Sequence, residues 1–385
     1  MDIAGLRIAL FSGNYNMTTD GANRALNRLV EYLQRHGATV RVYSPVNDRP
    51  AFEPQGRLVP VPSLPIPGRS EYRVPLFLPA AIRADLDAFR PHVVHISSPD
   101  FAAMGAVKWA RQRGLPVLAS VHTRFDTYPQ YYGLGFLERP LKALIRSVYT
   151  RCDALVTPSE SMAEVLREEG MNKDIGIWSR GVDRTVFSPD RRSPQWRRSL
   201  GIADDEVAVG FLGRLVMEKG LDVFGACVAE LARRGVPHRV LVVGEGPARD
   251  AFAKVVPGAV FAGFQSGADL GRAVASMDVL LNPSVTETFG NVTLEAMASG
   301  VPVVAARATG STSLVVDGET GRLVTPGDAA AFADAVAAYV TDESLRQAHG
   351  TAGEARSRGY SWDAINGAMA EVYLRLVTRR AATSA

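Results

Sequence analysis

Two glutamates, Glu287 and Glu295, stand eight positions apart in a stretch that reads PSVTETFGNVTLEAMASGVPV, residues 283–303. The stretch follows an apolar run, opens as a polar loop and then changes to helical spacing. This pattern predicts Glu287 at the exit of a strand and Glu295 in the first turns of a helix. Taken singly, Glu295 could instead complement the helix dipole, and Glu287 could be a solvated surface charge.

The helix that carries Glu295 is expected to begin at Gly290 and Asn291. Asparagine is a good helix cap, and the unpaired N–H groups of a helix start attract anions. A pair of carboxylates on either side of such a start is unusual for packing alone. The stretch is therefore a candidate binding site that can receive an anion.

Cationic residues follow an earlier strand, expected over residues 207–212. The loop GRLVMEKG holds Arg214 and Lys219 at the strand exit. Arginine can bind a phosphate through two parallel N–H bonds and lysine acts as a compact charge, so together they could neutralise a diphosphate. The alternative is an exposed pair around a turn. The next strand exit, VVGEGP with Gly244, lacks the full dinucleotide fingerprint, which argues against a nicotinamide enzyme.

These loops belong to a regular alternation of strands and helices that occupies both halves of the chain. The alternation predicts an α/β protein of two doubly wound Rossmann-like domains that face each other across a cleft. We expect an N-terminal domain over residues 1–185, a C-terminal domain over residues 186–360, and a last helix within residues 361–385 that returns towards the first domain.

The first domain starts with strand, loop and helix, and Gly21 stands at the helix start. A glycine there lets the main chain approach a phosphate, although a simple turn explains it as well. Residues 45–79 are rich in proline, which predicts an irregular excursion without a long helix. His92 and His95 flank a strand, where we expect histidines with satisfied hydrogen bonds.

A strand exit at His122 is followed by charged and aromatic residues. They are Arg124, Phe125, Asp126, Tyr128, Tyr131, Tyr132 and Phe136. Loops at this edge of a sheet often carry function, but a lid packed on its own side chains is an equal explanation. The segment RPLKALIRSVYTR, residues 139–151, predicts a basic amphipathic helix, which suits either an anionic membrane surface or an ordinary solvated face.

The composition is that of an ordinary soluble protein: 385 residues with a net charge of +3. Positive and negative residues are interspersed, which argues against a nucleic-acid partner. Cys152 and Cys227 are too few for a disulfide framework or a zinc site and are expected to be buried. The only Asp-x-Asp motif, Asp85 and Asp87, falls in a predicted helix and not at a strand exit, so we expect no metal site. No signal peptide or membrane-spanning segment is expected, which predicts a cytoplasmic protein.

The order of these motifs resembles that of the retaining nucleotide-sugar glycosyltransferases of GT-B architecture. The resemblance covers nearly the whole chain, through PHVVHISSP, SVHTRF, ALVTPSESMAEVL, RGVDRTVFSP, the GR-x4-K loop and the Glu-x7-Glu signature. The segments YYGLGFLERPLKAL and SRGVD are most similar to the subgroup of sulfoquinovosyl-diacylglycerol synthases and GDP-mannose-dependent α-mannosyltransferases.

The resemblance implies a role for each residue of the second domain. Glu295 would bind the ribose hydroxyls and Glu287 would contact the donor sugar. Arg214 and Lys219 would hold the diphosphate, and the turn at Gly244 would belong to the same donor site.

It also implies that the main chain at Gly290 and Asn291 helps to hold the diphosphate, which Gly21 would face from the first domain. His122 would lie beside the donor sugar. Phe264, in the turn GFQS, would border the nucleobase.

The activity implied is transfer of a hexose from a nucleoside-diphosphate sugar, GDP-mannose or a UDP-hexose, to a hydroxyl of a lipid or glycan, with retained configuration and without cofactor or metal. The basic helix favours a lipid acceptor and peripheral contact with the inner face of the membrane. The alternatives are a nucleotide-sugar epimerase, a non-catalytic sugar-nucleotide-binding protein, and a membrane-surface scaffold.

Overall fold

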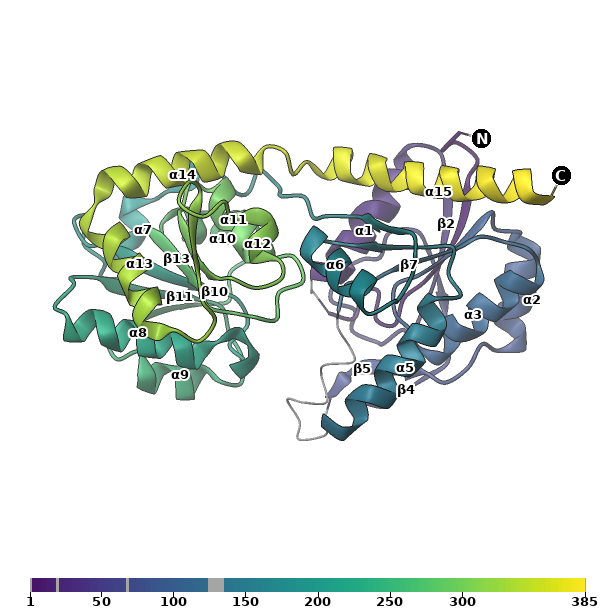
Figure 1. The fold of residues 1–385 in the computed structure, drawn as a ribbon, viewed down its shortest axis with the longest axis horizontal. Helices are drawn as coiled ribbons and strands as arrows, with labels where there is room; N and C mark the ends of the chain where they lie inside the picture. Colours follow the sequence, from purple (N-terminus) through teal and green to yellow (C-terminus); the bar gives the residue numbers. More distant parts are fainter. Residues whose placement is uncertain (1, 19–20, 67–68, 124–134, 385) are drawn as a thin grey trace. The chain divides into compact units, whose positions relative to one another are not determined.

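The computed structural model describes residues 2–18, 21–66, 69–123 and 135–384, and the chain divides into two compact units (Figure 1). Unit 1 consists of Met1–Ser179 and Trp362–Ala385, and unit 2 of Arg180–Ser361. The first unit is thus built from both ends of the chain. The sequence predicts boundaries at 185/186 and 360/361, whereas the chain divides after Ser179 and after Ser361.

Unit 1 is built on a parallel sheet of seven strands, in the order β3-β2-β1-β6-β7-β8-β9. The strands are β1 (Arg7–Phe11), β2 (Thr39–Ser44), β3 (Arg57–Pro60), β6 (Val93–Ile96), β7 (Val117–Ser120), β8 (Ala154–Thr157) and β9 (Ile175–Ile177). The order reverses between β1 and β6, so ligands of such a sheet are expected at the carboxyl ends of these two strands.

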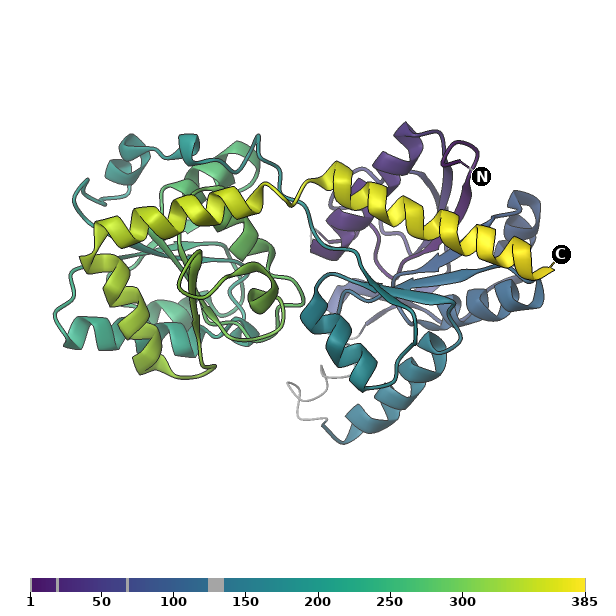
Figure 2. The same cartoon turned by 45° about the horizontal axis from the view of Figure 1, so that its top comes forward.

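Helices cover both faces of this sheet. They are α1 (Gly21–Arg35), α2 (Ala80–Phe89), α3 (Phe101–Gln112), α5 (Glu138–Tyr149), α6 (Glu160–Glu168) and α15 (Trp362–Ser384). One core joins α2, α3, α5 and α6 to the strands, and the other joins α1 and α15 to the opposite face. Figure 2 shows α15 beside α1 on that face.

The proline-rich segment contains regular structure that the sequence did not predict. Its described residues, 45–66 and 69–79, form no helix, but β3 extends the sheet and β4 (Ser63–Ile66) pairs with β5 (Arg69–Pro75) in an antiparallel hairpin. The prediction of an irregular excursion was therefore wrong. Proline is tolerated at sheet edges, because a missing N–H there leaves no partner unsatisfied, and Pro60 ends the edge strand β3.

Unit 2 is built on a parallel sheet of six strands, in the order β12-β11-β10-β13-β14-β15. The strands are β10 (Ala208–Leu212), β11 (Arg239–Val243), β12 (Val260–Gly263), β13 (Val279–Asn282), β14 (Val303–Ala306) and β15 (Gly321–Val324). Here the order reverses between β10 and β13. The loops with the predicted chemistry follow these two strands.

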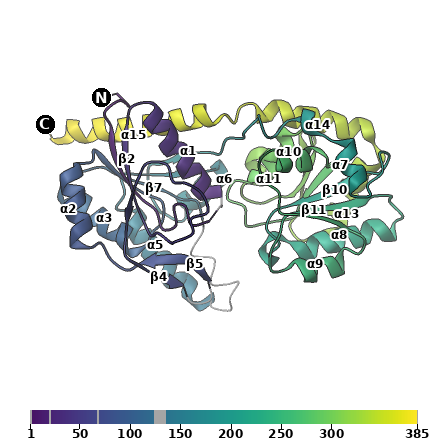
Figure 3. The same cartoon turned by 180° about the vertical axis from the view of Figure 1, so that it is seen from behind.

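The helices of unit 2 again lie on both faces of the sheet. They are α7 (Pro194–Ser199), α8 (Leu221–Arg233), α9 (Arg249–Val255), α10 (Gly267–Ala275), α11 (Asn291–Ala298), α12 (Ser311–Leu314), α13 (Ala329–Thr341) and α14 (Glu343–Ser357). Helices α8 and α9 cover one face with α13, and α10 and α11 cover the other (Figure 3).

A buried histidine joins the last helix to the sheet of unit 1. His95 in β6 is fully buried, with Nδ1 2.7 Å from the hydroxyl of Tyr373 in α15 and Nε2 2.8 Å from Oγ of Ser120 in β7. His92 accepts a hydrogen bond from the N–H of Arg7 at 3.1 Å. The expectation that both histidines are satisfied within the sheet is confirmed.

This arrangement predicts acid sensitivity of unit 1. Burial lowers the pKa of His95 from 6.5 to about 3, so the unfolded chain binds a proton over that range while the folded chain does not. His95 therefore does not reduce the free energy of unfolding above pH 6.5. As the pH drops towards 3, protonation of His95 in the unfolded chain lowers this free energy, by about 1.4 kcal/mol per unit of pKa difference. We expect His95→Gln to flatten the decline of melting temperature below pH 6.5. The exposed His36, changed to glutamine, is the control, and an equal slope in both variants would contradict the assignment.

Candidate active site

The loops after β10 and β13 are in direct contact at the carboxyl edge of the unit 2 sheet. Gly220 has a φ of +72°, and a Cβ there would lie 3.1 Å from the carbonyl oxygen of Pro283. Oγ1 of Thr286 also donates to the carbonyl of Glu218 at 3.2 Å. Position 220 therefore requires glycine, and the two loops are packed directly against each other.

Lys219 and Glu287 meet across this contact. Nζ of Lys219 lies 2.6 Å from Oε1 of Glu287, and the side chains are 29% and 15% exposed. The resemblance implies that Lys219 holds the diphosphate of the donor and that Glu287 contacts its sugar. In the structure, the two side chains form an ion pair with each other. An ammonium has three N–H donors, so Lys219 can keep this bond and still donate to a phosphate.

Arg214 lies on the same loop as Lys219 and is exposed. Among the residues that the structure describes, no hydrogen bond or ion pair holds its guanidinium, whereas its carbonyl accepts from the N–H of Val216 at 3.0 Å. The main chain is thus fixed while the charged group is free to bind an anion.

Helix α11 begins immediately after the Glu287 loop. Gly290 is the N-cap, with a φ of +94°, and no side chain in the described part of the protein caps the helix. Asn291 is the first helical residue, so the prediction of Asn291 as the cap was wrong. The left-handed main chain at position 290 favours glycine over asparagine. The uncapped N–H groups form an electropositive helix start beside Glu287.

Glu295 lies one turn further along α11 and is half-buried. Its carbonyl accepts hydrogen bonds from both the N–H and the hydroxyl of Ser299, at 3.1 and 2.9 Å. The helix therefore fixes the main chain at Glu295 on the turn that follows the anion-receptive start. Its proposed contact with ribose stays a prediction.

The loops after β11 and β12 lie on the other side of β10. Gly244 has a φ of +139°, and a Cβ there would lie 1.9 Å from the carbonyl oxygen of Gly213. This contact explains the glycine by packing of two turns, independently of any ligand. Phe264 follows β12 and is 66% exposed, which leaves its ring available for a flat partner.

The predicted residues of unit 1 lie at the carboxyl edge of its sheet or next to it. Gly21 begins α1, and His122 follows β7 with 8% exposure and its ring 5.3 Å from that of Trp178. The following loop residues, Arg124, Phe125, Asp126, Tyr128, Tyr131 and Tyr132, lie outside the described residues.

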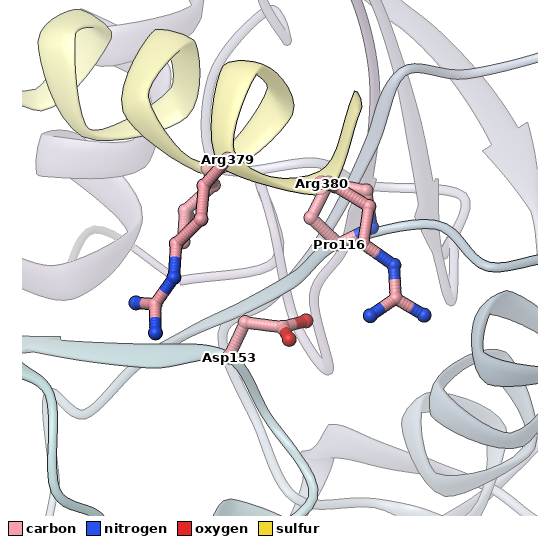
Figure 4. A pocket seen from close by; sticks show the side chains of 5 residues that line it. Pro116, Asp153, Arg379 and Arg380 are labelled. Carbon is pink, nitrogen blue, oxygen red and sulfur yellow. The ribbon is translucent and has the colours of Figure 1, made fainter. Parts of the chain in front are cut away.

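A cavity of about 220 Å³ lies at the opposite edge of the unit 1 sheet, lined by Pro116, Asp153, Leu376, Arg379 and Arg380 (Figure 4). Pro116 and Asp153 directly precede β7 and β8. The Asp153 carboxylate already accepts from Arg111 at 3.1 Å and from the N–H of Val117 at 2.8 Å. The cavity is therefore remote from the strand ends that carry the predicted chemistry.

The two aspartates of helix α2 are structural. Asp85 pairs with Arg41 and accepts from the Tyr43 hydroxyl, and Asp87 pairs with Arg113. In the described residues, no three His, Cys, Asp or Glu side chains gather as a metal site. No helix in the described part of the chain is long and apolar enough to cross a membrane. Both cysteines are buried, as predicted, and burial raises each thiol pKa to about 12.

Residues 19–186 match the model of Glycosyltransferase Family 4, and residues 206–342 match that of Glycosyl transferases group 1. The fold and the site thus define a glycosyltransferase of GT-B architecture.

Proteins of similar sequence identify the family of this chain. The chain is 31% identical to the sulfoquinovosyl transferase of Arabidopsis thaliana, over 93% of this chain and 71% of that protein. It is 32% identical to the GDP-mannose-dependent alpha-mannosyltransferase of Mycolicibacterium smegmatis, over 99% and 100%. Sucrose-phosphate synthase from Thermosynechococcus elongatus has a similar structure, with a TM-score of 0.81, 21% identity and coverage of 97% and 100%. The chain belongs to glycosyltransferase family 4.

Members of this family are retaining and metal-independent, and the chain is accordingly a retaining hexosyltransferase that uses a nucleotide sugar. The resemblance in motif order and the expected fold class are thereby confirmed. The individual roles of the site residues remain to be tested.

Proposed function

We propose that this enzyme transfers a hexose from GDP-mannose, or from a UDP-hexose, to a hydroxyl of a lipid or glycolipid. The observation that carries the proposal is the ion pair of Lys219 with Glu287, next in the chain to the start of α11, which no side chain of the described residues caps. Arg214 lies on the same loop as Lys219 and is exposed. GDP-mannose is the first donor to test, because the relative from Mycolicibacterium smegmatis is a GDP-mannose-dependent enzyme.

In the proposed reaction, the bond between the anomeric carbon and the diphosphate oxygen breaks, and the acceptor oxygen bonds to that carbon on the same face. The proton of the acceptor hydroxyl passes to an oxygen of the leaving phosphate. Negative charge grows on the diphosphate as the bond breaks, so fixed cations stabilise the transition state more than the ground state. Arg214, Lys219 and the start of α11 supply that positive charge.

The remaining roles follow the same proposal. Glu287 contacts the donor sugar, Glu295 binds the ribose hydroxyls and Phe264 borders the base. Unit 2 then binds the donor and unit 1 the acceptor. For Gly21, Gly244 and His122, the roles implied by the resemblance stay predictions.

A panel of donors tests the central claim. Purified enzyme is incubated with GDP-mannose, UDP-glucose, UDP-galactose or UDP-sulfoquinovose, with and without a lipid extract, and released nucleotide and labelled lipid are measured. We expect lipid-dependent release with one donor, and a rise in melting temperature with the matching nucleotide. Sugar isomerisation without transfer would identify an epimerase, and nucleotide binding without turnover would identify a binding protein.

Peripheral contact with an anionic membrane is the second part of the proposal. Phe136 and Leu137 precede α5 and are 74% and 40% exposed, and Leu144 within the helix is 38% exposed. Arg139 and Arg146 on the same helix are exposed as well. Apolar side chains beside cations are the combination that binds the surface of an anionic bilayer.

We expect Arg139→Gln to weaken binding to vesicles of phosphatidylglycerol and phosphatidylcholine by about 1 kcal/mol, and Phe136→Ser to weaken it further. Phe77→Ser is the control, because Phe77 is a ring with 59% exposure that precedes α2. Co-sedimentation measures the binding. Equal binding of all variants, or equal binding to vesicles of pure phosphatidylcholine, would exclude α5 as the contact.

A further inference from the structure

The main chain at Glu287 is held from a third loop, which follows β14. Oγ1 of Thr309 donates a hydrogen bond to the carbonyl oxygen of Glu287 at 3.1 Å. Within its own loop, the N–H of Thr286 donates to Oγ of Ser284 at 3.4 Å. The bond from Thr309 therefore ties the carbonyl of Glu287 to the loop after β14.

Gly310 makes the contact between these loops close. It has a φ of +88°, and a Cβ there would lie 2.8 Å from the carbonyl oxygen of Glu287 and 2.8 Å from the carbonyl carbon of Phe289. The turn after β14 is thus in main-chain contact with residues 287–289. A shift of the Glu287 peptide towards β14 is blocked, and the Thr309 hydroxyl opposes a shift away from it.

The side chain of Glu287 is held from the opposite direction. Strand β13 lies between β10 and β14 in the sheet. The carboxylate of Glu287 reaches Lys219 on the β10 side, while its carbonyl is bound by Thr309 on the β14 side. Both ends of this residue are therefore anchored to neighbouring strands.

We propose that Thr309 is a positioning residue, which fixes the main chain of Glu287 so that the carboxylate is aligned with the donor sugar. The inference rests on the proposed role of Glu287. Without the Thr309 hydroxyl, Glu287 keeps its ion pair with Lys219, but its carbonyl loses the hydrogen bond to the loop after β14. Misplacement of the Glu287 carboxylate then slows the chemical step, because its alignment with the donor sugar matters most in the transition state.

The test compares Thr309→Val, which has the same shape without the hydroxyl, with Thr309→Ser, which retains it. We expect Thr309→Val to lower kcat about tenfold to a hundredfold, with little change in the KM for the donor, the Kd for the nucleotide or the melting temperature. Thr309→Ser is expected to return most of the rate.

Thr312→Val is the matched control. Thr312 is three residues further on, and its Oγ1 donates to the carbonyl of Ala308 at 3.2 Å, away from Glu287. A normal kcat in Thr309→Val, an equal loss in Thr312→Val, or a loss that follows the melting temperature and is not restored by serine would overturn the proposal. Glu287→Gln measured in parallel separates the two claims. If that variant is inactive while Thr309→Val is normal, only the positioning role is wrong, and if it is fully active, the proposed role of Glu287 is wrong.

Discussion

Replacement of Arg214 with alanine is expected to lower kcat a hundredfold or more, which corresponds to about 3 kcal/mol of transition-state stabilisation. The leaving diphosphate gains charge as the glycosidic bond breaks, and Arg214 is a cation on a fixed main chain whose guanidinium makes no ion pair with the described residues. Lys219 shares its charge with Glu287, so it can replace Arg214 only in part. Ground-state binding of the donor should change less than kcat.

Steady-state kinetics with the matching donor, together with calorimetry of nucleotide binding, measures this effect. Arg214→Lys should recover part of the rate, because it restores the charge without the bidentate geometry. Arg198→Ala is the control for loss of one positive charge, since Arg198 is exposed and pairs with Asp204. An Arg214→Ala enzyme with unchanged kcat/KM would remove Arg214 from the site.

The second large effect is expected from Glu287→Gln, which should abolish measurable turnover while the nucleotide still binds. The substitution keeps the shape of the side chain and removes its charge, which is 2.6 Å from Nζ of Lys219. Lys219 then carries an unshared charge, so affinity for the diphosphate should hold or rise. The sugar loses its carboxylate partner, for which we expect a loss of about a hundredfold or more in kcat.

Single-turnover rates and nucleotide calorimetry on the same preparation separate these two quantities. Glu343→Gln is the control for loss of one carboxylate in the same unit, because Glu343 is exposed in the first turn of α14. Retained turnover would show that Glu287 is not needed for transfer. Loss of both turnover and nucleotide binding would show that the ion pair serves to hold the loop together.

The alternation of the two sheets could be predicted because buried parallel strands are short apolar runs with clear helical periods between them. The prediction failed where this signal is weak, since strands β3 to β5 contain prolines. The pairing of Lys219 with Glu287 could not be predicted either. These residues are far apart in sequence, and they meet only because β10 and β13 are neighbours in the sheet.

Thr309 could not be identified for a similar reason. A polar residue after a strand is a usable signal, and the segment TGST does follow β14. The signal is common, however, and the partner is a main-chain carbonyl, which leaves no mark on the sequence. What distinguishes Thr309 is the order of the strands, which places its loop next to that of Glu287.

The packing of α15 in unit 1 has a consequence for the order in which the two units fold. Met369, Tyr373, Leu376 and other apolar residues of α15 complete a core whose remaining members come from the first 179 residues. During translation, one apolar surface of the N-terminal segment therefore stays uncovered until α15 has been synthesised. Residues 180–361 form the other unit and can fold before α15 is made. A chain without α15 would expose that surface, and exposed apolar surface promotes aggregation.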